Sequence, residues 1–341
     1  MRVHGRRKVL ALAAGVLAAA TACTGNAAPP PPSRTATPSA SPSPTAPEVA
    51  ITQAEAAQEF FKVTVTDDRL RVKSPLQGRL RLAVDLTTGG QTELTKAAYL
   101  STDYAPIRHK WGTPTLIVPR WARTEAAPWF SALATRDGSP ALLTFAKSDD
   151  RWRLSSVALL LPGQQLPEIQ RDADGYATAL ASDDKSITIS PQFMGPVHAS
   201  VAETGSTGVT AGLVAAGPYT TDVAEQIATQ RAEAKSTGYS YDSIFSPDSF
   251  PVYALRTKDG GALIQYSLSR TTTTTAMTKS AMDEGVPVPT SAGWLFKEPR
   301  QQRTLRLIET HQYAAVVPLL KAPAPAAVIA HDGALTRGSG R

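Results

Sequence analysis

The chain has 341 residues, of which 42% are hydrophobic, 19% are charged and 27 are proline, and it contains one cysteine. This composition excludes a wholly disordered protein, a disulfide framework and a cysteine-rich metal site, and the length allows about two domains. Four of the 35 cations lie in residues 1–8, which leaves 31 cations against 29 anions in the rest of the chain. We therefore see no electrostatic basis for binding nucleic acid.

The N-terminal segment combines basic residues, a short apolar run and the cysteine. Residues 9–20 are mostly apolar, and Ala20-Thr21-Ala22-Cys23 follows. The run spans about 18 Å as a helix, too short for a hydrocarbon core of about 30 Å, so residues 1–22 have the pattern of a signal peptide. Small residues before a cysteine resemble the lipobox of bacterial lipoproteins. This resemblance implies cleavage before Cys23 and acylation of its thiol, with palmitate among the attached chains.

Lipid on Cys23 would hold the protein at the cell membrane, on its extracytoplasmic side, because several acyl chains anchor far better than one. Two alternatives stay open: a chance cysteine behind an ordinary cleavable signal, and an uncleaved anchor. Arg6-Arg7 also resembles a twin-arginine export signal. Both that route and the Sec route therefore stay open.

A proline-rich stretch follows the cysteine. Residues 24–48 contain eight prolines and are otherwise mostly Ala, Ser and Thr, so with Cys23 they predict an extended tether over 23–48. A lipobox, a Pro/Ser/Thr-rich tether and an ectodomain rich in Ala, Arg and Thr together resemble the uncharacterised surface lipoproteins of high-GC Gram-positive bacteria, the actinomycetes. The resemblance carries no catalytic residue.

A short pattern occurs twice in the ectodomain. Residues 132–139, ALATRDGS, and residues 254–261, ALRTKDGG, each place Asp-Gly between apolar strands. Glycine accepts the positive φ of a tight hairpin turn, so both copies predict β-hairpins. The offset of about 122 residues suggests a duplicated domain rather than a solenoid.

Each hairpin follows a predicted helix start. One is at residues 52–61, where Thr52 is the expected cap with Glu55 three residues on, and the other is at residues 167–180. The sequence therefore predicts an α+β fold of two similar tandem halves. We expect a first domain over 49–165, a second over 166–321 and a flexible tail over 322–341.

Strands are expected at 115–121, 129–135, 141–147 and 152–161 in the first half, and at 252–257, 262–270 and 303–317 in the second. Five threonines at 271–275 lie in an expected insertion, and residues 221–235 form the clearest amphipathic helix. A helix followed by a curved antiparallel sheet resembles the cone-shaped fold of the nuclear-transport-factor-like and cystatin-like superfamilies.

Motifs for enzymatic chemistry are scarce. Gly-x-Ser-x-Gly, closely spaced histidine and acidic ligands, and phosphate-binding glycine loops do not occur, so we expect neither metal nor cofactor. Glu309 and His311 are the best catalytic candidates, because alternate residues of a strand share one face and a carboxylate can orient an imidazole. The alternative is that both line a half-exposed strand.

Two further groups of residues each allow two interpretations. Arg69, Arg71, Lys73, Arg79 and Arg81 alternate with apolar residues, which predicts a half-buried hairpin whose wet face could contact anionic lipid or wall polymer. The candidates for a ligand pocket are the tryptophans Trp111, Trp121, Trp129 and Trp152. Packing in the core is the favoured interpretation of these tryptophans.

The leading hypothesis is a non-catalytic, lipid-anchored envelope lipoprotein whose tandem ectodomain binds an envelope protein or a wall component. Two other classes stay open, an envelope enzyme and a carrier of a small molecule or lipid, both using a cavity in one half. Enzyme and carrier need a real cavity, whereas an interaction module would fill its cone with side chains.

Overall fold

The computed structural model describes residues 49–72 and 78–341, and these belong to one compact unit. Cys23, the tether and Lys73 lie outside the described residues. The helices are α1 (Gln53–Leu70), α2 (Gly78–Asp85), α3 (Gly89–Leu100), α4 (Pro191–Thr204), α5 (Thr221–Ser236) and α6 (Lys279–Glu284), with 3-10 turns at Gly205–Thr207 (η1) and Thr290–Leu295 (η2).

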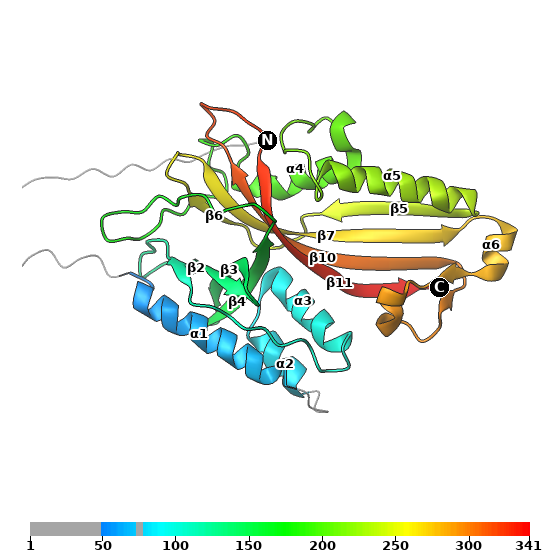
Figure 1. Ribbon diagram of the computed structural model, residues 1–341, viewed down its shortest axis with the longest axis horizontal. Coiled ribbons are helices and arrows are strands. Elements are labelled where there is room, and N and C mark those ends of the chain that lie inside the picture. Colours follow the sequence, from blue (N-terminus) through cyan, green and yellow to red (C-terminus); the bar gives the residue numbers. More distant parts are fainter. Residues whose placement is uncertain (1–48, 73–77) are drawn as a thin grey trace, which may run out of the picture. The chain divides into compact units, whose positions relative to one another are not determined.

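One large antiparallel sheet contains most of the strands (Figure 1). Its strands are β1 (Thr115–Ile117), β2 (Trp129–Arg136), β3 (Ser139–Ser148), β4 (Arg151–Leu160), β5 (Tyr239–Ser246), β6 (Tyr253–Arg256), β7 (Ala262–Ala276), β10 (Thr304–Val317) and β11 (Ala327–Gly340). A separate small pair consists of β8 (Val286–Pro287) and β9 (Arg300–Gln301).

The strand order, β1-β2-β3-β4-β11-β10-β7-β5 with β6 beside β7, consists of two meanders. The first runs from β1 to β4, and the second runs from β5 through β7 and β10 to β11. They meet where Leu159 and Leu160 of β4 pair with His331 and Ala330 of β11. The last strand of each meander therefore joins the two.

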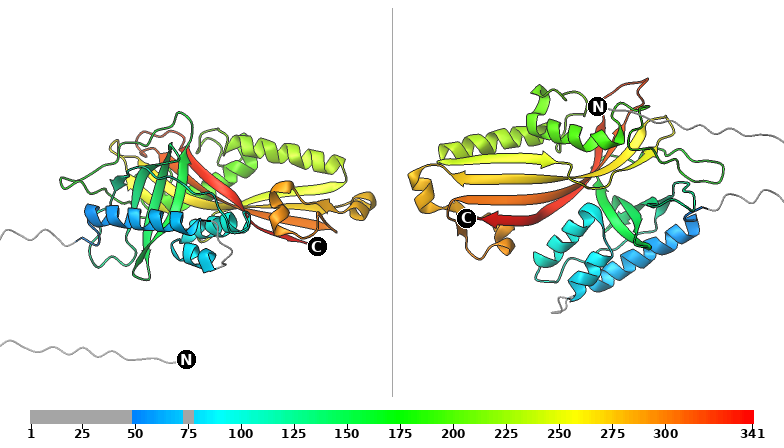
Figure 2. Two further views of the ribbon diagram at one scale, coloured as in Figure 1. Left: turned by 60° about the horizontal axis from the view of Figure 1, so that its bottom comes forward. Right: turned by 180° about the vertical axis from the view of Figure 1, so that it is seen from behind.

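Helices cover the outer faces of the two meanders (Figure 2). Phe60 and Val63 of α1 pack against the first meander. Met194 of α4 and Ile227 of α5 pack against the second. A third apolar cluster combines Leu142 of β3 with Leu263 of β7 and further residues of both meanders. The inner faces of the two meanders thus share one core.

Several elements expected from the sequence are confirmed. Thr52 caps α1 in a capping box with Glu55, and the amphipathic helix is α5. Both Asp-Gly hairpins form, as β2–β3 and β6–β7. At the first turn, Asp137 and Gly138 both have positive φ, 54° and 89°, as a tight two-residue turn requires. The α+β class is confirmed as well.

The expected flexible tail is wrong. Residues 327–340 form β11, which lies in the middle of the sheet between β4 and β10. Ile329 and Ala330 are 3% and 1% exposed. The small residues that suggested a loose end instead fit a strand that passes through the crowded junction of the two meanders.

Two local predictions are also wrong. The cationic segment forms no hairpin among the described residues, because Arg69 lies in the last turn of α1 while Arg79 and Arg81 lie in α2. Residues 167–180 form no helix, since the carboxylate of Asp172 accepts hydrogen bonds from the backbone N–H groups of Asp174 and Tyr176 and closes a turn there. The five threonines belong to β7 rather than to an insertion.

Candidate ligand-binding site

A cavity of about 470 Å³ lies beside the outer face of the second meander, and we name it the Arg270 pocket. It is lined by residues of α5, β5, β7, β8, η2, β10 and β11. Its walls combine the apolar residues Val286, Pro287, Pro289, Leu305, Leu307 and Leu335 with the uncharged polar residues Gln230, Thr237, Thr272, Thr274 and Ser291. Arg270 and Glu309 are its only charged lining residues among those the structure describes. A mostly apolar cavity with a few polar groups is typical of small-ligand sites.

Strand register brings the polar groups together. Arg270 of β7 pairs with Glu309 of β10 on one side and with Phe245 of β5 on the other. Directly paired residues of antiparallel strands project from the same face. Three segments separated in the sequence therefore supply one cluster.

The Arg270 guanidinium is held in place by β5. Its Nε donates to Ser243 Oγ at 2.8 Å and its Nη2 donates to the Tyr241 hydroxyl at 3.3 Å. The guanidinium carbon lies 5.6 Å from the centre of the Phe245 ring, within the range of a cation–π contact. The side chain is 17% exposed, so it is positioned but still reaches the cavity.

Glu309 lies near the Arg270 guanidinium and the His311 imidazole, with both contacts longer than an ordinary hydrogen bond. Its Oε2 is 3.6 Å from Arg270 Nη1 and 3.8 Å from His311 Nε2. Burial opposes ionisation of Glu309, but His311 and Arg270 outweigh it and lower the pKa of the carboxyl group. The pocket therefore contains an ionised carboxylate beside a guanidinium.

Two histidines lie behind the carboxylate. His311 Nδ1 and His331 Nε2 are 3.0 Å apart, and the His331 ring stacks on Tyr219 with centroids 4.0 Å apart. Burial, followed by the influence of His311, lowers the pKa of His331 to about 3. His331 is therefore neutral at pH 7, which suits its place between other aromatic rings.

A glycine makes room for this contact. Gly333 pairs with His311 across β10 and β11. A Cβ atom at Gly333 would lie 2.5 Å from His311 Nδ1, closer than carbon and nitrogen can approach without displacement. The absence of a side chain there lets the His311 ring lie across β11 toward His331.

Glu309 and His311, the catalytic candidates from the sequence, are neighbours, but they differ in their access to the pocket. Glu309 lines the pocket, whereas His311 does not, and His311 Nε2 is buried. Sequence reasoning missed Arg270 and His331, which reach the cluster only through strand pairing. The charged end of an otherwise uncharged strand, residues 262–270, was the available signal for Arg270.

The four tryptophans do not share a pocket. Trp121 and Trp129 pack together with ring centroids 5.7 Å apart and belong to the core between the meanders. Trp152 packs against Phe130 at 5.2 Å. Of the four, Trp111 and Trp152 line cavities, and these are separate.

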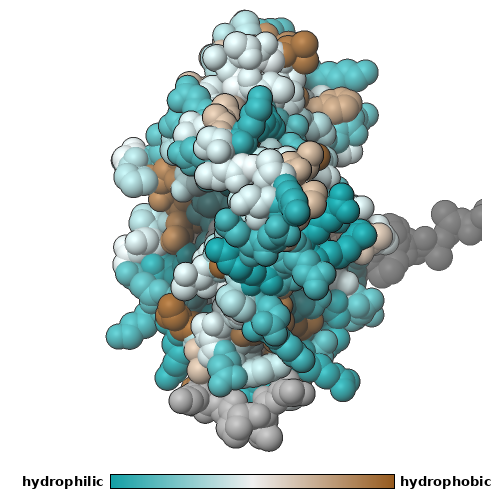
Figure 3. All heavy atoms as spheres, turned by 90° about the vertical axis from the view of Figure 1, so that its right-hand side faces the viewer, coloured by the Kyte–Doolittle hydropathy of each residue, from teal (hydrophilic) through white to brown (hydrophobic). Residues whose placement is uncertain are grey.

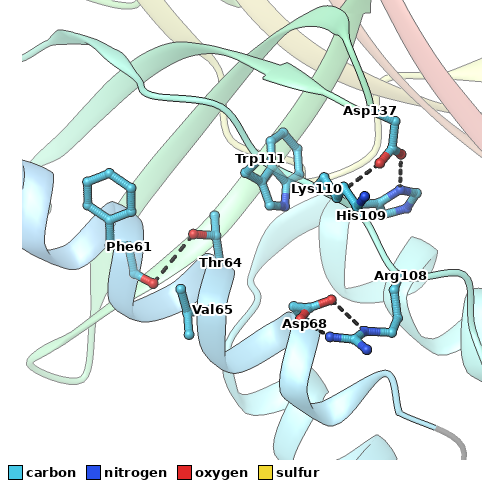
Figure 4. Close-up of a pocket in the computed structure, with 9 residues that line it drawn as sticks. All are labelled: Phe61, Thr64, Val65, Asp68, Arg108, His109, Lys110, Trp111 and Asp137. Atoms are coloured by element: carbon cyan, nitrogen blue, oxygen red, sulfur yellow. Dashed lines mark hydrogen bonds and ion pairs between the residues drawn. The ribbon is translucent and has the colours of Figure 1, made fainter.

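Trp111 lines a second cavity of about 600 Å³, which we name the Trp111 hollow. Its lining residues are Phe61, Thr64, Val65, Asp68, Arg108, His109, Lys110, Trp111 and Asp137 (Figure 4). Asp68 accepts two hydrogen bonds from Arg108, and Asp137 accepts from His109 Nδ1 at 2.7 Å and from the Lys110 backbone N–H at 2.8 Å. Both carboxylates are thus satisfied within the protein, unlike Glu309.

Other features of the described residues limit the kinds of site. Within residues 49–72 and 78–341, no group of His, Cys, Asp and Glu has the geometry of a metal site. In the same ranges, no helix is long and apolar enough to cross a membrane. The end of the molecule beside α6 is mostly hydrophilic, with its apolar residues in separate small patches (Figure 3). The cavities are therefore the better candidates on this side.

A family described as "Domain of unknown function (DUF8094)" matches residues 49–340. The chain belongs to this family. The DUF8094 match includes both meanders, the Arg270 pocket and the strand β11.

Two curated relatives are uncharacterised lipoproteins of Streptomyces. The protein from Streptomyces coelicolor is 31% identical over 66% of this chain, and the one from Streptomyces avermitilis is 26% identical over 61%. The aligned part covers 63% and 60% of the relatives' own lengths, so this DUF8094 chain spans about three fifths of each. No solved structure matches the chain. The predicted resemblance to uncharacterised lipoproteins of actinomycetes is confirmed.

Proposed function

We propose that this protein is a lipid-anchored lipoprotein of the cell envelope, with its ectodomain on the extracytoplasmic side. The lipobox-like residues before Cys23 support this proposal, and so do the names of the two Streptomyces relatives. Acyl chains on Cys23 would supply the membrane attachment, and the proline-rich residues 24–48 would act as the spacer.

The ectodomain acts as a non-catalytic binding module for an envelope component, and the Arg270 pocket is its binding site. The observation that carries this proposal is the Arg270–Glu309 ion pair, which lines the pocket and whose two members are 3.6 Å apart, without a direct hydrogen bond between them. The Glu309 carboxylate is only 32% exposed, and its neighbours Arg270 Nη1 and His311 Nε2 lie at 3.6 and 3.8 Å, beyond ordinary hydrogen-bond distance. Partly buried charged groups at such spacings are usually bridged by a water or by a ligand.

Binding fits this geometry better than acid–base catalysis. His311 does not line the cavity, and its Nδ1 is engaged by His331. The lowered pKa of Glu309 makes its carboxylate a weak base at neutral pH. The enzyme interpretation, with Glu309 as base and His311 as orienting residue, is therefore less well supported.

The Arg270 pocket favours a carrier of a small molecule or lipid as the second candidate function. A small-molecule or lipid carrier needs an open pocket, and about 470 Å³ lies within the range of ligand sites. The binding module and the carrier differ in whether the ligand is released to a third component. A protein or wall polymer would insert only one group into the pocket.

The fold is proposed to consist of two similar tandem halves of the nuclear-transport-factor-like or cystatin-like kind. The mirrored order of the two meanders supports this proposal, as does the helix layer outside each. The first half would cover residues 49–165, and the second would begin at residue 166 and include β11, which pairs with β10. A solved structure in which the two halves superpose poorly would contradict the duplication.

The anchor is tested with the Cys23→Ala variant. Without the thiol, the protein should leave the membrane fraction, and metabolic labelling with a palmitate analogue should be lost. A Cys23→Ala protein that remains in the membrane fraction with the labelled lipid would contradict the lipoprotein proposal. The matched control is Ser33→Ala, which lies in the same tether and should change neither readout.

The pocket is tested by thermal denaturation of the full chain carrying Cys23→Ala. Fractions of muropeptides, envelope lipids and small polar extracts are added separately. We expect at least one fraction to raise Tm, because a ligand that binds the native state stabilises it. Leu307→Trp should fill the cavity and abolish the increase, whereas Val209→Trp, at a fully exposed position, should not. If no fraction raises Tm, the binding proposal fails.

A further inference from the structure

The Arg270 pocket has both hydrogen-bond donors and hydrogen-bond acceptors that the protein itself does not use. Arg270 uses its Nε and one Nη2 N–H within the protein, while its Nη1 lies 3.6 Å from Glu309 Oε2. A guanidinium has five N–H groups, so about three have no hydrogen-bond acceptor among the described residues. Glu309 accepts no hydrogen bond within 3.5 Å from those residues. The pocket therefore offers donors and acceptors side by side.

The opposite charges of Arg270 and Glu309 disfavour a ligand that carries charge of one sign only. An anion approaching Arg270 would also approach the ionised Glu309, and a cation approaching Glu309 would approach Arg270. One opposite pair 3.6 Å apart leaves the floor without net charge, and a ligand of one sign would leave one partly desolvated charge unpaired. A ligand that carries both signs within one small head group pairs with both.

The walls of the pocket indicate the chemistry of the rest of the ligand, beyond its charged groups. Leu305 and Leu307 precede Glu309 at alternate positions of β10, on the same face of the strand. Four residues of a strand span about 13 Å. Pro287 of β8 and Leu335 of β11 add further apolar wall. Thr272 and Thr274 of β7 pair with Leu307 and Leu305 and line the same stretch, so the cavity extends from its charged end between uncharged and mainly apolar walls.

We propose that the Arg270 pocket binds a zwitterionic head group attached to an apolar body of about 13 Å or less. The anionic end lies against Arg270 Nη1, the ammonium end lies against Glu309, and the apolar body follows β10 toward Leu305. This proposal rests on the proposed function, since it names the ligand class of the same site. Two sources have this chemistry, an apolar peptide with free termini and a short-chain aminophospholipid.

The test measures binding to the full chain carrying Cys23→Ala by isothermal titration calorimetry. The peptide arm compares leucyl-phenylalanine with its N-acetyl and methyl ester forms. The lipid arm compares dihexanoyl phosphatidylethanolamine with dihexanoyl phosphatidylglycerol, below their micellar concentrations. In at least one arm, the zwitterion should bind about tenfold more tightly than each form lacking one charge. Each such form makes one charge-assisted hydrogen bond fewer. The arm that shows this preference identifies the source.

Variants test the roles of the two charges. Arg270→Gln should weaken the zwitterion about tenfold and reverse the preference toward the cationic methyl ester, while Glu309→Gln should favour the anionic forms. A residue with a purely structural role would not produce opposite changes in preference. Arg231→Gln is the matched control, because Arg231 pairs with Asp242 on the exposed surface nearby and should leave the preference unchanged.

The outcomes separate the two proposals. Equal affinity for zwitterionic and singly charged probes, or unchanged preference in both pocket variants, would overturn the ligand class. The binding function would still stand if an envelope fraction raised Tm and Leu307→Trp abolished that increase. If neither probes nor fractions bind, both proposals fail.

Discussion

The side chain of Gln312 in β10 takes the place of a strand neighbour for Val157 in β4. Its Oε1 accepts a hydrogen bond from the Val157 backbone N–H at 2.8 Å, and its Nε2 donates to the Ser155 carbonyl at 3.1 Å. Gln312 is fully buried. Because β4 and β11 pair over two residues at this junction, the glutamine amide continues the hydrogen bonding that the strands do not provide.

Replacing this amide should weaken the junction of the two meanders. Gln312→Leu leaves a buried N–H and a buried carbonyl without partners, each costing about 1–3 kcal/mol. We expect the free energy of unfolding to fall by about 2–4 kcal/mol, measured by urea denaturation. Gln165→Leu, at an exposed position, should change it by less than about 0.5 kcal/mol. Equal effects of the two variants would contradict this role.

Acid should destabilise the protein through its buried histidines. Burial lowers the pKa of His198 to about 4, and burial with His311 lowers that of His331 to about 3, from an ordinary 6.5. Between the ordinary pKa and the lowered pKa of each histidine, the unfolded chain binds a proton that the folded chain does not. The free energy of unfolding therefore has its full value above about pH 6.5 and falls as the pH decreases toward 4.

The His331→Gln variant isolates one part of this pH dependence. The slope of the unfolding free energy against pH, measured between pH 6.5 and 4, should decrease by about one proton compared with the parent protein. A Val209→Ala control should keep the parent slope, because its side chain is exposed and does not titrate. An unchanged slope in His331→Gln would show that His331 is not the titrating group.

Gly333→Ala should disturb the histidine pair. The new Cβ would lie 2.5 Å from His311 Nδ1 and 3.1 Å from the Thr310 carbonyl oxygen, so the imidazole or the strand must move. Such overpacking costs about 1–3 kcal/mol, which urea denaturation would detect. Gly293→Ala is the control, since nothing lies within 4 Å of its added Cβ. A Gly333→Ala protein as stable as this control would contradict the tight contact.

The C-terminal strand should be essential for folding. Ending the chain at residue 322 removes β11 and separates β4 from β10, so we expect loss of a cooperative unfolding transition in circular dichroism. Ile329→Ala, at a 3% exposed position, should cost about 2–5 kcal/mol. Leu320→Ala, at 54% exposure, should cost much less. A truncated chain that still unfolds cooperatively would show that β11 is dispensable.

Sequence by itself determined the local features of this protein. Apolar alternation predicted β2, β3, β4, β6 and β10, because a half-buried strand needs a period of two. Asp-Gly predicted both hairpin turns, and Thr52 with Glu55 predicted the start of α1. The face shared by Glu309 and His311 also follows from neighbouring positions in one strand. Each of these features depends on interactions within a few residues.

Tertiary structure decided everything that depends on register between distant segments. Pairing between strands brings Arg270 to Glu309, 39 residues away, and His331 to His311, 20 residues away. The small and polar residues of β11 suggested a loose tail, yet their burial depends on β4 and β10 on either side. Strand pairing is satisfied by backbone groups that all residues share, so a single sequence does not specify its partners.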